Sequence, residues 1–378
     1  MEQFFPTTFR TPYFLVDETR LRQNLSCLKE VVDRTGCKIL LAQKAFSMFY
    51  CYPLIRTYLS GTTASGLYEA RLGYEAFGKE THVFSPAYRE DEFDELLQYA
   101  DDFVFNSPSQ LKKYGLRAKK AGKSIGLRIN PECSTQDGHA IYDPCAPGSR
   151  LGTTYEQFDE SLLPLLDGLH FHTLCEQNAD ALETTVEAFL LKFGRYLPKM
   201  RWINLGGGHH ITRADYDVER LIRIILRLKD QYGVEVYLEP GEAVVLNAGF
   251  LVSQVLEIVH NKLDIAILDT SAACHMPDVL EMPYRPPVQN SAKPGEKAYT
   301  YRLAGPTCLA GDVIGDYAFD APLSPGDVVV FEDMALYTMV KTNTFNGMPL
   351  PSIVWRDKNG VQQLIRSFSY ADFKSRLS

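Results

Sequence analysis

The stretch KILLAQKAFS, residues 38–47, is an apolar run that ends on a lysine, Lys44. Lysine is depleted from β-strands and is rarely buried without a partner, so its presence here requires a chemical reason. The same stretch also separates two α/β folds. A doubly wound nucleotide-binding sheet needs a glycine-rich turn after its first strand, and AQKAFSMF, residues 42–49, contains no glycine. The pattern therefore disfavours the doubly wound sheet.

Seven further short apolar runs follow the first and alternate with helix-like segments. Apolar residues in those segments recur at i, i+3 and i+4, which is typical of helices packed against a sheet. Eight such units over roughly 230 residues match an α/β fold with a (β/α)8 TIM barrel. After the fifth run comes a long loop, 131–152, and then an expected helix from about Tyr155. The expected strands are 38–43, 62–65, 82–85, 103–106, 124–130, 168–174, 202–206 and 234–240.

The sequence changes character from about Gly249 onward. Strand-like runs separated by Pro, Gly and Asn replace the helical periodicity, which indicates a second, mostly β domain. We expect the barrel domain to span 13–245. The β domain would comprise 246–378 together with 1–12 and would contribute to a dimer and to the active site.

Composition excludes several classes of protein. The chain has 378 residues, of which 45% are hydrophobic and 23% charged, as in ordinary globular proteins. Its net charge of −8 argues against a nucleic acid as the main partner. No apolar run is long enough for a membrane span, and the N-terminus lacks a signal-peptide pattern. The eight scattered cysteines indicate reduced thiols, so we expect a cytoplasmic protein.

Four of the predicted strand ends carry reactive groups, and in a barrel these ends form one rim. The groups are an amine, an imidazole, a glycine-rich turn and a carboxylate: Lys44, His172, GGGHH at 206–210, and Glu239. A desolvated lysine is a nucleophile toward carbonyl groups, and a glycine turn before a helix binds phosphate through backbone N–H groups. A carboxylate can hold a pyridinium nitrogen. Together these groups predict the cofactor pyridoxal 5'-phosphate, with no metal required.

Motifs along nearly the whole chain resemble one known family. The sequence is similar to the pyridoxal-phosphate decarboxylases of the alanine-racemase-like fold, the group that contains ornithine, arginine and diaminopimelate decarboxylases. The matching motifs occur in the family's order: TPYFLVDE (11–18), AQKAF (42–46), LRINP (127–131), GLHFHTLCEQ (168–177), NLGGGHH (204–210), LEPGEA (238–243), GPTCLAGD (305–312) and TFNG (344–347).

The resemblance implies roles for the residues at the rim. Lys44 matches the lysine that attaches the cofactor covalently, and His172 matches the histidine that stacks on its ring. Gly207 and Gly208 match the phosphate-binding turn. Glu239 matches the acid that pairs with the pyridine nitrogen and so keeps the ring an electron sink for decarboxylation.

The resemblance also implies roles for two residues of the β domain. Tyr337 matches a tyrosine that helps to hold the phosphate. Cys308 matches a cysteine that reaches the active site of the partner subunit and helps to protonate the carbanion left by decarboxylation. A site built from two chains implies a homodimer with shared active sites.

Departures from the family pattern point to the substrate. Many relatives have arginine after EPG, where this chain has Glu242, and an acidic residue after GPTC, where it has Leu309. Cys175 replaces a common phosphate-binding serine. Compared with those relatives, the expected pocket gains a carboxylate at position 242 and lacks one at position 309. This change suits a longer substrate with amines along its chain, such as a carboxylated triamine.

Two acids are the main candidates for binding the ammonium groups of such a polyamine. Glu242 and Asp278 are predicted to pair with them, because a buried cation without a carboxylate is costly. Weaker candidates are Glu176, Asp312 and His275, and for Asp312 a purely structural role is equally compatible with the sequence.

Several alternatives stay open at this point. The nearest is decarboxylation of diaminopimelate or another basic amino acid. A metal-dependent barrel hydrolase could use the histidines of HFH (170–172) and of HH (209–210), but that interpretation leaves Lys44 and GPTC unexplained. A non-catalytic pyridoxal-phosphate carrier would lack the β domain, and a racemase would need a second base opposite the lysine.

Overall fold

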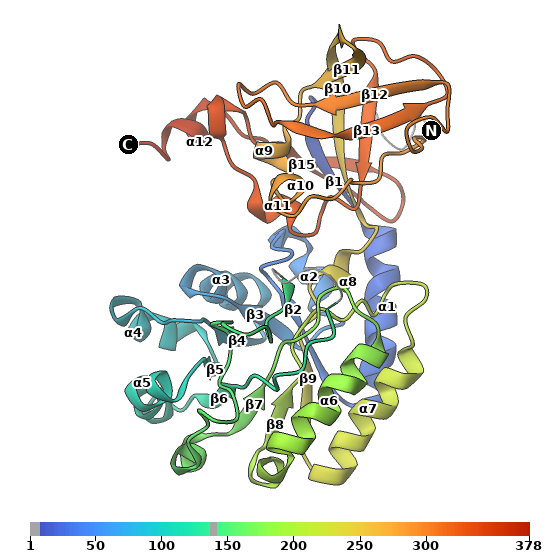
Figure 1. Ribbon diagram of the computed structural model, residues 1–378. Coiled ribbons are helices and arrows are strands. Elements are labelled where there is room, and N and C mark those ends of the chain that lie inside the picture. Colours follow the sequence, from blue (N-terminus) through green and yellow to red (C-terminus); the bar gives the residue numbers. More distant parts are fainter. Residues whose placement is uncertain (1–7, 137–141) are drawn as a thin grey trace. The chain divides into compact units, whose positions relative to one another are not determined.

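The computed structural model describes residues 8–136 and 142–378, and Figure 1 shows their secondary structure. The chain divides into two compact units, one formed by Asn24–Val244 and the other by residues up to Gln23 together with Val245–Ser378. The expected limits, 13–245 for the barrel domain and 246–378 together with 1–12 for the β domain, remain a prediction.

The predicted barrel is confirmed in the first unit. Within the described residues, eight parallel strands close into a ring in which each strand pairs with the next along the chain and the last pairs with the first. These strands are β2 (Lys38–Ala42), β3 (Gly61–Ala64), β4 (Glu80–Phe84), β5 (Asp102–Phe105), β6 (Ser124–Arg128), β7 (Gly168–His170), β8 (Trp202–Asn204) and β9 (Glu235–Leu238).

Helices follow the strands on the outside of the barrel (Figure 1). In α7 (Val218–Tyr232), for example, the Asp217 side chain caps the N-terminus by accepting from the Arg220 N–H, and Gly233 ends the helix in the left-handed conformation. The other helices that precede strand β10 (Gly249–Asn261) in the chain are α1 (Glu18–Thr35), α2 (Tyr52–Ile55), α3 (Leu67–Leu72), α4 (Glu90–Tyr99), α5 (Pro108–Lys120), α6 (Ala179–Phe193) and α8 (Glu242–Val245).

One expected helix is wrong. The segment from about Tyr155 does not form an α-helix. It forms a short 3₁₀ helix at Glu160–Leu165, with Pro164 inside it. Proline lacks the N–H that an α-helix needs and clashes with the preceding turn, so apolar spacing alone was misleading here.

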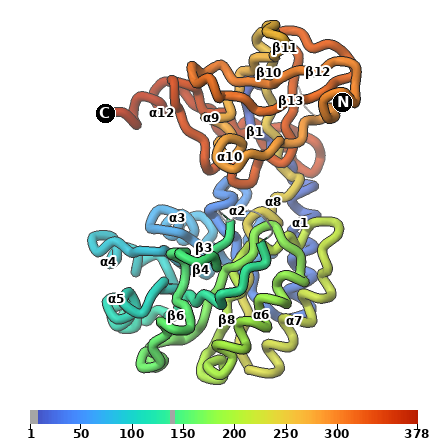
Figure 2. Tube along the Cα trace, in the orientation of Figure 1, coloured from blue at the N-terminus to red at the C-terminus, as the bar shows by residue number. Residues whose placement is uncertain are grey.

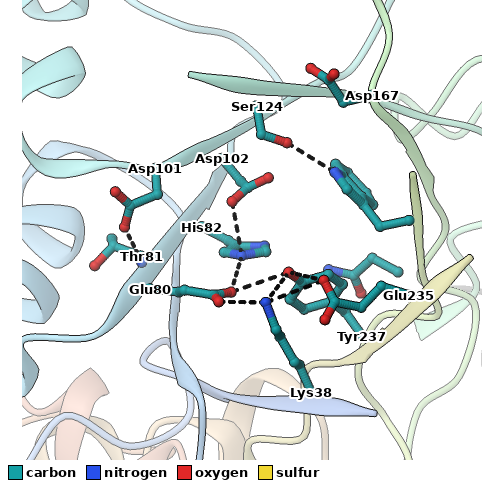
Figure 3. Close-up of polar contacts among 12 residues, drawn as sticks. Lys38, Glu80, Thr81, His82, Asp101, Asp102, Ser124, Asp167, Glu235 and Tyr237 are labelled. Carbon is teal, nitrogen blue, oxygen red and sulfur yellow. Dashed lines mark hydrogen bonds and ion pairs between the residues drawn. The ribbon is translucent and has the colours of Figure 1, made fainter. Parts of the chain in front are cut away.

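A polar cluster closes the N-terminal end of the barrel (Figure 3). His82 is buried, and its Nε2 lies 3.1 Å from Asp102 Oδ2 and 3.4 Å from Glu80 Oε2. Burial lowers the pKa of His82, but the two carboxylates outweigh it and raise the pKa overall. Polar groups at this end of a barrel serve stability, since the opposite end carries catalysis. The cluster comprises Lys38, Glu80, His82, Asp102, Glu235 and Tyr237.

The second unit is built on the predicted β-rich fold, which is confirmed. Its strands form a mixed sheet in the order β13-β12-β11-β10-β1-β15-β16, and β14 pairs with β10. The strands are β1 (Tyr13–Asp17), β10 (Gly249–Asn261), β11 (Leu263–Leu268), β12 (Tyr299–Ala304), β13 (Val313–Phe319), β14 (Val328–Glu332), β15 (Ser352–Arg356) and β16 (Gln362–Arg366).

The N-terminal strand β1 lies inside this sheet. It pairs antiparallel with β10 and parallel with β15, so Tyr13 faces both Val252 and Ser352 in register. Figure 2 shows the blue trace of β1 among the yellow and orange strands. Five buried residues in succession fit a central strand that is covered on both faces.

Short helices complete the second unit: α9 (Ala272–His275), α10 (Asp278–Glu281), α11 (Thr338–Lys341) and α12 (Tyr370–Lys374). No helix in the described part of the chain is both long enough and apolar enough to cross a membrane. All eight cysteines lie in the described ranges, where they are free thiols.

Candidate active site

Lys44 follows β2 at the C-terminal end of the barrel. Its side chain is accessible to solvent, yet the protein around it desolvates the amine and lowers its pKa. The two observations agree if solvent reaches the amine from one direction while protein surrounds it on the others. The positive charge of Arg128 lowers the pKa further, and Glu239 and Glu242 oppose the effect. Among the described residues, Lys44 Nζ has no hydrogen-bond or ion-pair partner, so the amine is available for chemistry.

The glycine turn after β8 has a conformation that only glycine fits. Gly206 and Gly208 have φ of 71° and 79°. A Cβ on Gly208 would lie 2.0 Å from the carbonyl oxygen of Leu174, and a Cβ on Gly206 would lie 2.4 Å from that of Phe171. Within the described ranges, the backbone N–H groups of Gly208 and His209 have no acceptor. Two such N–H groups in a tight turn form a site for an anion.

His172 is held in one orientation beside this turn. Its Nδ1 accepts from the Gly207 N–H at 3.1 Å, and Arg128 Nη2 donates to its carbonyl oxygen at 3.0 Å. Desolvation, followed by the charges of Lys44 and Arg128, holds the pKa of His172 well below its usual value. The ring is therefore neutral with its proton on Nε2, and a neutral flat ring is suited to stacking on another ring.

Glu239, just after β9, is an ionised carboxylate in the barrel interior. It is 7% exposed, its Oε1 accepts from Asn204 Nδ2 at 2.7 Å, and its Oε2 lies 3.4 Å from His170 Nε2. Burial by itself would raise the pKa of Glu239, but His170, His82 and the Asn204 hydrogen bond lower it to about 2. Its negative charge is therefore present at every physiological pH.

Glu242 lies in the same unit, at the start of α8. Its Oε2 lies 3.1 Å from His210 Nε2, so one of its two carboxylate oxygens already has a partner. Its charge acts on both Lys44 and Cys175. Desolvation, followed by the charge of Glu242, raises the pKa of Glu176. The acids at this rim thus form a negative region close to the reactive amine.

Cys308 belongs to the second unit and is exposed. Its backbone N–H donates to Asn346 Oδ1 at 2.7 Å, which ties the GPTC and TFNG motifs together. Asp312 is 3% exposed and holds the same loop by accepting from Thr307 Oγ1 at 2.6 Å and from Ser271 Oγ at 3.0 Å. Of the two roles left open for Asp312, these contacts favour the structural one.

The other predicted residues of the second unit have varied surroundings. Tyr337 is partly buried, has φ of 53°, and lies with its ring 5.6 Å from Lys341 Nζ. Asp278 forms an ion pair with the same lysine. His275 is fully buried, with Thr270 Oγ1 2.9 Å from Nδ1 and the Pro349 carbonyl oxygen 3.0 Å from Nε2. Satisfied on both nitrogens, His275 is a core histidine.

The barrel residues present fit pyridoxal 5'-phosphate. An amine without a partner, an anion-binding turn, a neutral imidazole and a buried carboxylate lie on successive strand ends of one rim. They match the aldehyde, phosphate, ring and ring nitrogen of the cofactor, in that order. The structure thus brings Lys44, His172, Gly207, Gly208, Glu239 and Glu242 into one unit, while Cys308, Tyr337 and Asp278 belong to the other.

Sequence reasoning missed three residues around this group. Arg128 stands inside the LRINP motif and Asn204 lies two residues before the first of the three glycines, but neither residue had a function assigned to it. His170 alternates with His172 on β7 and was considered only as a metal ligand. In each case the signal was the position of a polar residue at the end of a buried strand.

Comparisons with known proteins agree with this chemistry. Residues 25–335 match the family described as pyridoxal-dependent decarboxylase, C-terminal sheet domain. The carboxynorspermidine/carboxyspermidine decarboxylase of Campylobacter jejuni is 44% identical over 98% of this chain and 100% of its own length. The carboxyaminopropylagmatine decarboxylase of Synechocystis sp. is 42% identical over 97% of this chain and 95% of that protein.

A solved structure is similar along nearly the whole chain. The crystal structure of carboxynorspermidine decarboxylase from Campylobacter jejuni, complexed with norspermidine, has a TM-score of 0.90 and 43% identity to this chain. The match covers 97% of this chain and 100% of that one, so it includes both the barrel and the sheet.

Proposed function

The chain belongs to the family of pyridoxal-dependent decarboxylases, and from this premise we propose that it converts carboxynorspermidine and carboxyspermidine to norspermidine and spermidine in polyamine biosynthesis. The observation that carries the proposal is the full-length similarity to an enzyme with these substrates, at 44% identity. Family membership also decides against the metal-dependent hydrolase and the non-catalytic carrier.

The cofactor of this family is pyridoxal 5'-phosphate, which, when bound, withdraws the electron pair that a departing carboxyl group leaves behind. Lys44 would hold it covalently through Nζ, and His172 would stack on its ring. Glu239 would accept a hydrogen bond from the protonated ring nitrogen. Gly208 would bind the phosphate through its N–H, together with Tyr337, whereas the Gly207 N–H already donates to His172 Nδ1, so Gly207 would contribute only the shape of the turn. Tyr337 is a proposal from family resemblance alone.

Substrate selection is assigned to two acids. Glu242 would pair with one substrate ammonium through the carboxylate oxygen that His210 does not engage. Asp278 would pair with another, and that ammonium would replace Lys341 as its partner. Without such carboxylates, the ammonium groups of a bound polyamine would lose their hydration, and no ion pair would offset that cost in free energy. The 42% identity to the Synechocystis enzyme makes carboxyaminopropylagmatine the second candidate substrate.

We predict that purified protein loaded with cofactor releases carbon dioxide from carboxyspermidine and carboxynorspermidine with kcat/KM about 100-fold above that for meso-diaminopimelate and ornithine. Ornithine and meso-diaminopimelate each keep one amine besides the α-amine, so each lacks one of the two ammonium groups that Glu242 and Asp278 would bind. One missing ammonium–carboxylate contact costs about 1–3 kcal/mol, which corresponds to about 5- to 150-fold in kcat/KM. Carbon dioxide release measured on all four compounds and on carboxyaminopropylagmatine checks this. Turnover of meso-diaminopimelate or ornithine alone would contradict the proposal.

Glu242→Gln provides the matching variant for that assay. It should lower kcat/KM for the triamines about 10-fold or more, because a neutral amide replaces the charge that pairs with ammonium. The control is Glu187→Gln, which removes an exposed acid that pairs with Arg227 on the outer helices. Equal kcat/KM in the two variants would remove Glu242 from the list of substrate-binding residues.

We further propose a cytoplasmic homodimer in which Cys308 of the partner subunit completes each active site. The free thiols and the exposure of Cys308 support this arrangement, because the cysteine is accessible to a second chain. Closed two-fold dimers bring the same two surfaces together twice, so each dimer would contain two such composite sites.

Mixing of inactive variants tests the shared site. Lys44→Ala and Cys308→Ala should each be nearly inactive alone, whereas an equimolar, dissociated and reassociated mixture should recover roughly a quarter of wild-type activity. Half of the dimers would then be mixed, with one intact site each. Sedimentation of the mixture reports the dimer, and carbon dioxide release reports the sites. A dimer without recovered activity would show that each site uses one chain only.

A further inference from the structure

Asn204 is the last residue of β8 and has no exposed surface. Its side-chain amide is bonded on both sides. Nδ2 donates to Glu239 Oε1 at 2.7 Å, and Oδ1 accepts from the Gly206 N–H at 2.9 Å. One planar group therefore connects the buried carboxylate to the glycine turn.

The two neighbours of this amide belong to opposite ends of the proposed cofactor site. Glu239 is assigned to the ring nitrogen, and the turn that begins at Gly206 is assigned to the phosphate. A backbone bond reinforces the link, since the Glu239 N–H donates to the Gly206 carbonyl oxygen at 2.8 Å. Relative movement of the carboxylate and the turn would break both connections.

We propose that Asn204 is a positioning residue that fixes both ends of the cofactor site at once, by holding Glu239 at the ring nitrogen and the glycine turn at the phosphate. The inference rests on the proposed function, because it uses the assignments of Glu239 and of the turn. A side-chain amide supplies a donor and an acceptor on two separate atoms at the same time.

The alternative supports for these groups are weaker. His170 also faces the carboxylate, but at the longer distance of 3.4 Å, and the only other polar atom of its ring, Nδ1, has no partner in the described part of the chain. Without Asn204, Glu239 Oε1 would be a buried acceptor with no donor, and the Gly206 N–H would lose its acceptor. Each such loss costs about 1–3 kcal/mol.

Two substitutions of the full-length protein separate the two bonds. Asn204→Leu removes both and should weaken binding of pyridoxal 5'-phosphate to the apoprotein about 10- to 100-fold. Asn204→Asp keeps the acceptor for Gly206 but faces Glu239 with a second carboxyl group. At pH 6, where the pair can share one proton, its cofactor affinity should stay within about threefold of wild type.

At pH 9 the shared proton of Asn204→Asp is lost, and the ratio of its affinity to that of wild type should fall about 10-fold between pH 6 and pH 9. The readouts are the dissociation constant and the visible absorbance of the bound cofactor titrated from pH 6 to 9, both without substrate. Wild type has no second carboxyl group beside Glu239, whose pKa lies at about 2. The affinity of Asn204→Asp is therefore divided by the wild-type affinity at the same pH, which cancels the protonation of Lys44 and of the cofactor phosphate that both proteins share.

Asn106→Leu is the matched control. Asn106 also donates to one backbone carbonyl, of Arg150 at 2.8 Å, and accepts from one N–H, of Gly152 at 2.7 Å. It should lose comparable stability in thermal melts but leave the cofactor titration unchanged. If Asn204→Leu does not fold, the nearly isosteric Asn204→Asp still tests the proposal.

Three outcomes would overturn the inference: an affinity of Asn204→Leu within threefold of wild type, identical titrations of Asn204→Asp and Asn204→Leu, or a ratio of Asn204→Asp to wild-type affinity that is independent of pH. The test is independent of the substrate assignment. Wild type that binds the cofactor but ignores carboxyspermidine would refute the substrate and leave the inference about Asn204 standing. Wild type that binds no cofactor would refute both.

Discussion

Lys44→Ala is expected to remove the visible absorbance of the bound cofactor and to lower kcat by about 1,000-fold or more. The reason is that Lys44 would supply the amine that attaches the cofactor, and no other lysine directly follows the C-terminal end of a predicted barrel strand. Desolvation lowers the pKa of this amine, so a larger share is neutral and nucleophilic at pH 7 than for an exposed lysine. Absorbance spectra before and after borohydride treatment, together with carbon dioxide release, measure the effect.

The matched control for Lys44→Ala is Lys120→Ala. Lys120 is an exposed residue at the end of α5, so the control removes the same ammonium group from a solvated surface. Its absorbance and kcat should stay at the wild-type level. A Lys44→Ala protein that retained a borohydride-sensitive visible band would assign the covalent attachment to another residue.

Gly208→Ala is expected to lower the free energy of unfolding by about 3–5 kcal/mol and to abolish tight cofactor binding. Two penalties combine. The residue has φ of 79°, where L-residues are strained, and the new Cβ would lie 2.0 Å from the Leu174 carbonyl oxygen, a backbone atom that cannot rotate away. The turn would have to open, and its N–H groups would no longer converge on the phosphate. Urea unfolding and cofactor titration measure the two effects.

Gly122→Ala separates these penalties. Gly122 has φ of 74°, but a Cβ there would meet no atom within 4 Å. It should therefore cost only the conformational strain, about 1–2 kcal/mol, and leave cofactor affinity unchanged. If Gly208→Ala were destabilised no more than Gly122→Ala, close packing would not be what requires glycine in the phosphate turn.

The barrel could be predicted because its signals are local. Each strand is a short apolar run followed by a helical pattern, and a parallel βαβ order leaves little choice of topology. Once the strands were in place, Lys44, His172 and Glu239 had to lie on one rim, since the C-terminal ends of parallel strands meet there. The helix expected near Tyr155 failed for a local reason as well, because Pro164 interrupts it.

Other features depended on residues far apart in the sequence. That β1 lies between β10 and β15 is a matter of partners more than 200 residues away, which no local pattern identifies. Glu242 was predicted to face the substrate, but its hydrogen bond to His210 became visible only in the folded chain. The same holds for the ion pair of Asp278 with Lys341.

By itself the sequence determined the strand order of the barrel, the residue types at its rim and hence the cofactor, because periodicity and position along a strand are encoded in neighbouring residues. Only the tertiary structure decided the state of those residues: the desolvated amine of Lys44, the single orientation of His172, and the link that Asn204 makes between Glu239 and the glycine turn. Burial and hydrogen bonding depend on distances between segments, and these distances exist only once the barrel has closed.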